Sequence, residues 1–83
     1  EAERRKALQP LKKILDRSES RLEKLNMRKG QLESELADTG LYAEQRKNEL
    51  QQLLRDKAAL DQQLEEAESA WMEAAEALEQ AQD

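Results

Sequence analysis

The 83-residue sequence contains no cysteine, no histidine and no phenylalanine, and its only aromatic residues are one tryptophan and one tyrosine. The lack of cysteine excludes a disulfide framework and a thiolate metal site, and the lack of histidine removes the commonest general base and metal ligand. No apolar run approaches the roughly 18 to 20 residues of a membrane span. So few large side chains cannot surround a globular interior, but they can fill a narrow seam between two long helices.

The sequence is rich in charged residues and in leucine. Charged residues make up 40% of the chain, and this composition is typical of coiled coils and long helices. The leucines recur at heptad spacing, which a disordered tract would have no reason to keep. Two arms carry the pattern: seven of nine seam positions in the first are leucine, and ten of twelve in the second are apolar. The predicted seam consists of Leu8, Leu11, Leu15, Ser18, Leu22, Leu25, Lys29, Leu32 and Leu36, and then of Ala43, Arg46, Leu50, Leu53, Lys57, Leu60, Leu64, Ala67, Trp71, Ala74, Leu78 and Ala81.

The segment 38–42, Asp-Thr-Gly-Leu-Tyr, is the one clear interruption of this pattern. Gly40 can adopt the left-handed conformation that closes a helix C-terminus, and the two polar residues before it prefer to bond to their own backbone. We expect Leu41 and Tyr42 to fold back and pack at the end of the rod, with contact to a partner as the second interpretation of Tyr42. The predicted fold is all-α: an antiparallel two-helix coiled-coil hairpin.

The domain boundaries follow from the bend and from Pro10. Proline is harmless in the first turn of a helix, so residues 1–9 form a basic lead-in that either extends the helix with a kink or frays as part of a linker. Because the sequence opens on Glu1 and not on methionine, we expect a fragment of a longer protein. The prediction is a single domain over residues 1–83, with a first helix at about 10–37, a bend at 38–43 and a second helix at about 44–82.

The pairing register can be predicted by folding the chain about Leu41. This fold places Trp71 opposite Leu11, so we predict that the indole packs in the core and does not serve as a stacking platform. A register one heptad tighter is the alternative. We favour the looser register because the tighter one draws Gly40 into the second helix.

The charges are segregated along the chain. Residues 1–30 carry ten Lys or Arg against five acidic residues, whereas residues 31–83 carry four against fourteen. A row of cations on a rod can follow a phosphate backbone, and without an aromatic residue on it the contact would be to phosphates and not to bases. The alternative interpretation is that the two arms attract each other and the outer charges are solvated. The candidate nucleic-acid-binding residues, which we call the basic stripe, are Arg5, Lys6, Lys13, Arg17, Lys24 and Arg28.

The sequence offers no candidate for catalysis. Its many glutamates lie along a helix where nothing would shift their pKa, and there is neither a glycine-rich phosphate loop nor a Cys/His cluster. We therefore expect no catalytic residue, no cofactor and no metal site within these 83 residues.

A set of residues forms a recognisable pattern: Glu35-Leu36-Ala37-Asp38, Leu41-Tyr42, Leu50, Leu53, Ala59-Leu60, Leu64, Glu68, a lone Trp71, Glu76 and Leu78-Glu79. This pattern resembles the C-terminal coiled-coil hairpin of ABC-F proteins, which are soluble ATPases with two tandem ABC cassettes. The opening Leu8-Gln9-Pro10-Leu11 and the segment Arg46-Lys47-Asn48-Glu49-Leu50 are most similar to the YheS-type branch, with the Uup-type branch as a relative. The resemblance spans almost the whole chain.

The resemblance implies a cytoplasmic arm attached to the second cassette. Family members bind the ribosome and couple ATP binding to translation, and the comparable tail of the Uup-type proteins is associated with DNA binding. ATP and the ATPase activity would belong to the absent cassettes. Ribosomal RNA, DNA and the protein's own cassettes stay open as targets. We expect the fragment to be monomeric and to have no membrane partner, and the rival hypothesis is a structural or oligomerising coiled coil with no nucleic-acid role.

Overall fold

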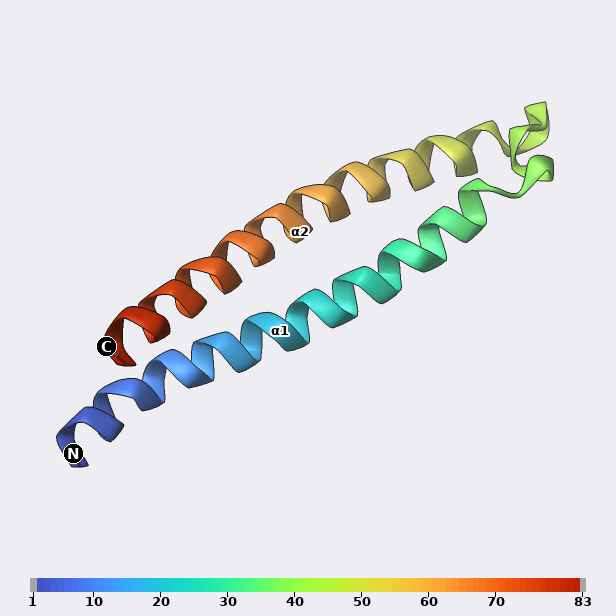
Figure 1. Cartoon of the computed structure of the whole chain (residues 1–83). Coiled ribbons are helices and arrows are strands. Elements are labelled where there is room, and N and C mark those ends of the chain that lie inside the picture. The colour runs from blue at the N-terminus through green and yellow to red at the C-terminus, as the bar shows by residue number, and fades with distance from the viewer. Residues whose placement is uncertain (1, 83) are drawn as a thin grey trace.

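The computed structural model describes residues 2–82, which form two long antiparallel helices joined by a short tip (Figure 1). Helix α1 spans Ala2–Leu36 and helix α2 spans Lys47–Gln82, with two 3-10 turns between them, η1 at Thr39–Tyr42 and η2 at Glu44–Arg46. The rod measures 65 × 15 × 14 Å, and the two chain ends lie together at the end opposite the tip. Residues 2–82 contain no strand. The predicted all-α hairpin is confirmed.

Helix α1 begins at Ala2, well before the predicted start at residue 10, and ends at Leu36 instead of residue 37. The basic lead-in is therefore helical from residue 2, with Pro10 inside the helix. Proline has no N–H to donate to the backbone hydrogen bonds of a helix. The seam nevertheless continues on the N-terminal side of Pro10, where Leu8 is half-buried. Arg4 Nη2 also donates a hydrogen bond to the carbonyl oxygen of Ala81 at 3.4 Å. Contact with the end of α2 thus supports the lead-in as a helix.

The seam of α1 follows the predicted heptad residue by residue. All nine predicted positions are buried or half-buried, and every other residue of Ala2–Leu36 is exposed. Burying one leucine contributes about 1.5 to 3 kcal/mol, so these contacts dominate the stability of the rod. The centre of the seam is a buried cluster of Leu32, Leu60 and Leu64, against which Leu22, Leu25 and Leu53 pack.

The seam of α2 departs from the prediction at Trp71. Its indole was expected in the core, but it is 36% exposed, and its Nε1–H donates a hydrogen bond to Glu19 Oε1 at 3.2 Å. The neighbouring seam residues on the same helix, Ala67 and Ala74, are buried. The ring therefore lies at the edge of the seam, where its N–H reaches a polar partner. The other predicted seam residues of the second arm that are exposed are Ala43 and Ala81.

The helices pair in a later register than predicted. Folding about Leu41 would set Ile14 level with Glu68, whereas Ile14 shares a groove with residues between 70 and 77 of α2. The cause is the length of the connection, because residues 44–46 form η2 and α2 begins only at Lys47. Helix α2 therefore begins three residues later than predicted.

Candidate nucleic-acid interface

The basic stripe lies entirely on α1, and all six of its side chains are exposed. Successive residues of an α-helix turn by about 100°, so Lys6, Lys13, Arg17 and Lys24 project within about 40° of one another, away from the seam. Arg28 borders this row on its seam side, and Arg5 projects roughly a quarter-turn away from it. The helix thus aligns four of the six predicted residues closely. At ~1.5 Å per residue the distance from Lys6 to Arg28 along the axis is about 33 Å.

No member of the basic stripe takes part in an ion pair in the described part of the chain. Between residues 5 and 82 the ion pairs join Arg46 to Asp38 and to Glu49, and Lys57 to Asp61. None of these pairs links α1 to α2. The exposed charges of the stripe are therefore not held in close ion pairs with the second arm.

A shallow hollow of about 540 Å³ runs beside the stripe on α1. Three cations border it against the single carboxylate of Asp16, and its lining residues are Asp16, Arg17, Ser20, Arg21, Lys24 and Leu25. The two aromatic residues lie elsewhere, Tyr42 in η1 and Trp71 on α2. Without a stacking platform such a surface suits phosphate groups and not bases.

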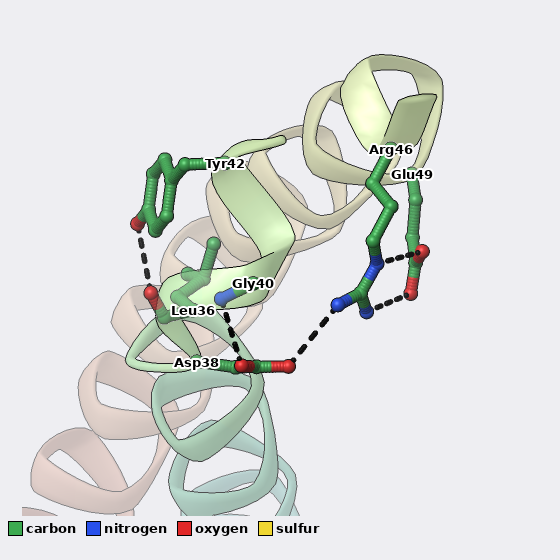
Figure 2. A network of polar contacts seen from close by, with 6 residues as sticks. All are labelled: Leu36, Asp38, Gly40, Tyr42, Arg46 and Glu49. Atoms are coloured by element: carbon green, nitrogen blue, oxygen red, sulfur yellow. Dashed lines mark hydrogen bonds and ion pairs between the residues drawn. The ribbon is translucent and has the colours of Figure 1, made fainter. Parts of the chain in front are cut away.

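The tip is held by Arg46, whose guanidinium bridges two carboxylates (Figure 2). Arg46 Nε and Nη2 donate hydrogen bonds to the two oxygens of Glu49 at 2.9 and 3.0 Å. Arg46 Nη1 lies 3.2 Å from Asp38 Oδ2, while Asp38 Oδ1 accepts a hydrogen bond from the Gly40 amide at 3.0 Å. The heptad pattern predicts only a seam position for Arg46. The one signal of its role was the i, i+3 spacing to Glu49.

These contacts shift the pKa of all three side chains at the tip. Hydrogen bonds from the Gly40 amide and then from Arg46 lower the pKa of Asp38. The hydrogen bond from Arg46 lowers the pKa of Glu49, and Glu49 followed by Asp38 raises the pKa of Arg46. The cluster therefore stays fully charged near neutral pH, so it orders the tip and is unsuited to acid or base catalysis.

The chain turns at the tip without a left-handed residue. Gly40 lies inside η1, and no residue from 2 to 82 has a positive φ angle. The predicted left-handed helix cap is therefore wrong, and the side chain of Asp38 caps η1 instead. Leu41 is fully buried, as expected of a residue that closes the end of the seam. Tyr42 is 60% exposed, and its hydroxyl donates a hydrogen bond of 2.7 Å to the carbonyl oxygen of Leu36 (Figure 2).

The carboxylates of α2 are spread along its exposed surface. Within residues 2–82 no group of three or more potential ligands is arranged to hold a metal ion. No helix in the same part of the chain is both long and apolar enough to cross a membrane. The exposed glutamates of the second half of α2 are Glu65, Glu66, Glu68, Glu73, Glu76 and Glu79.

The two antiparallel helices and the tip closed by Arg46 define an all-helical coiled-coil hairpin with one cationic helix. Comparison with protein-family models gives a match to the ABC transporter C-terminal domain over residues 6–81, which takes in both helices and the tip. The chain belongs to this family, and it is the C-terminal domain of an ABC-family protein. Searches among curated proteins and among solved structures found no match.

Proposed function

We propose that this chain is the C-terminal coiled-coil arm of an ABC-F type ATP-binding protein and that its basic stripe contacts the phosphate backbone of ribosomal RNA or DNA. The parent protein would bind and hydrolyse ATP in connection with translation in the cytoplasm. The arm would add binding energy and orientation, and it would carry no catalysis of its own.

The observation that carries this proposal is the exposure of the stripe without an intramolecular ion pair. A row of cations about 33 Å long on a straight helix can neutralise several phosphates and release their counterions. The opposite helix is acidic, with four Lys or Arg against fourteen acidic residues in 31–83. Because α2 repels phosphates, the rod would bind with α1 towards the nucleic acid. The family match supports an arm attached to an ABC protein.

The rival architecture, a parallel dimer with one continuous helix per chain, is contradicted by the tip. The chain leaves the helical path after Leu36 and doubles back so that its own two arms fill the seam.

The salt dependence of binding to ribosomes and to duplex DNA tests the proposal. In the variant Lys13→Glu/Lys24→Glu two phosphate contacts are lost, so the slope of log K against log salt should fall by about 2 for a duplex, and the affinity should drop. The matched control is Lys47→Glu/Arg55→Glu, which makes the same charge change at exposed residues of α2 and should lose far less affinity. If both variants bind like the parent chain, or if both lose affinity equally, the stripe is not the contact surface.

A further inference from the structure

One long edge of the rod, which we call the Ile14 edge, has an apolar groove at its open half. The groove has a volume of about 240 Å³, and its lining residues are Leu11, Ile14, Ala70, Glu73, Ala74 and Ala77. Ile14 is 46% exposed there, because the alanines across the groove are too small to cover it. A large apolar side chain and a row of small ones thus lie side by side without a cover.

From this groove towards the tip, the edge carries positively charged side chains on α1 and negatively charged side chains on α2. Alternating steps of three and four residues keep side chains on one face of a helix. On α1 such steps lead from Ile14 through Arg17, Arg21, Lys24 and Arg28, and on α2 they lead from Glu73 through Glu66 to Asp56. The four cations and both glutamates are exposed, and none of them forms an ion pair within the described residues. The Ile14 edge therefore has a positive half on α1 and a negative half on α2.

We propose that a second copy of this chain covers the Ile14 edge, in a dimer whose twofold axis runs parallel to the two rods. This symmetry sets α1 of each copy across from α2 of the other at the same level. Ile14 of one copy then enters the alanine groove of the second copy. The opposite orientation, with the rods antiparallel, would set α1 against α1 and bring cations together, so charge favours the parallel arrangement.

The levels of the charged residues agree with this arrangement. Ile14 lies level with residues 70–77, which share its groove. Because the helices run in opposite directions with equal rise, Arg21 lies level with residues 63–70 and Arg28 with residues 56–63. Arg21 thus faces Glu66 of the second copy, and Arg28 faces Asp56 of the second copy. The symmetry forms each pair twice.

The edge is large enough for such an interface. A side of 65 × 15 Å offers at most about 1,000 Å² per copy, and a standard interface buries about 800 Å² per partner. A twofold dimer is also closed, so it does not propagate into a filament. The result would be a four-helix bundle with the tips at one end.

This dimer replaces the monomer that was expected from the sequence. It goes beyond the proposed nucleic-acid contact and can be tested separately from it. The decisive residues, Arg21 and Glu66, are not members of the basic stripe. Arg21 borders the cationic hollow beside the stripe, so Arg21→Glu can weaken both contacts. Glu66 lies on α2 outside that hollow, so Glu66→Lys leaves the proposed phosphate contacts in place and separates the two proposals. Three stripe residues, Arg17, Lys24 and Arg28, do lie on the Ile14 edge, so nucleic acid and the second copy would compete for them.

Sedimentation equilibrium of the 83-residue chain is the test. The parent chain should dimerise, and Arg21→Glu or Glu66→Lys should each raise the dimer dissociation constant roughly tenfold or more, since like charges then face each other twice. Combining the two substitutions should restore the constant to within about threefold. The matched controls Lys12→Glu and Glu68→Lys, exposed residues on the opposite edge, should leave it within about threefold.

Three results would overturn the dimer. The first is a chain that stays monomeric up to millimolar concentration. The second is a dimer that responds to the control variants as strongly as to Arg21→Glu and Glu66→Lys. The third is a double variant that associates no better than either single variant.

Discussion

Replacement of Leu60 by alanine should cause a large loss of thermal stability, and its size can be worked out from the seam. Leu60 is 4% exposed and belongs to the buried cluster with Leu32 and Leu64. Leucine-to-alanine changes in cores cost about 2 to 5 kcal/mol. A two-helix seam has solvent close on both edges, so we expect a value near the lower end, about 2 to 3 kcal/mol. At about 4 to 8 °C per kcal/mol for a domain of this size, the Tm should fall by roughly 10 to 20 °C.

The matched control is Leu54→Ala, the same chemical change on the same helix at a side chain that is 50% exposed. It should alter the free energy of unfolding by no more than about 0.5 kcal/mol. Thermal unfolding followed by far-ultraviolet circular dichroism, at a concentration where the chain is monomeric, measures both variants. Equal shifts at Leu60 and Leu54, or a larger shift at Leu54, would refute the assignment of the seam.

Two further predictions concern the tip and the middle of α1. Because the pKa values of Asp38 and Glu49 are lowered in the folded chain, their stabilisation is complete above the ordinary carboxylate pKa of about 4 and is lost as the pH falls below it. Arg46→Ala should therefore reduce the acid-induced fall in Tm, and an unchanged acid response would show that the cluster does not stabilise the tip. A Cβ at Gly30 would meet nothing within 4 Å, so Gly30→Ala should raise the free energy of unfolding by about 1 kcal/mol in a denaturant titration. A decrease would show that another surface approaches Gly30 closely.

The architecture and the seam of α1 could be predicted from the sequence because leucine spacing and burial have the same physical cause. A side chain at a heptad position faces the other helix whatever its partner is. For this reason even Ser18 and Lys29, the two polar residues of the α1 pattern, lie buried or half-buried at the predicted positions.

The departures from the prediction depend on contacts between distant residues, which local pattern does not contain. Trp71 occupies a heptad position, but its indole lies partly exposed and donates a hydrogen bond to Glu19 of the other helix. The lead-in is helical from residue 2, where Arg4 bonds to Ala81 near the end of α2 and Leu8 is half-buried. The register moved because η2 lengthens the tip. Each outcome required knowledge of how far apart the two helices lie or how many residues the connection uses.

The candidate sites also differ in whether local periodicity or contacts between distant residues determine them. The exposure of the basic stripe follows from helical periodicity alone, and the structure agrees at all six positions. The contact of Arg46 with Asp38 joins residues on the two sides of the tip, so periodicity could not reveal it. The Ile14 edge likewise joins residues of both helices, and it depends on a pairing register that differs from the predicted one.

The most direct test of the hairpin itself is the distance between nitroxide labels at Ala7→Cys and Glu79→Cys, two exposed positions near the open end, measured with unlabelled chain in excess. Neighbouring helices lie about 8 to 10 Å apart, so with the length of the label arms the antiparallel hairpin predicts a distance of roughly 15 to 30 Å. A continuous helix through the tip would separate the same positions by about 108 Å at ~1.5 Å per residue, and a distance near that value would contradict the fold.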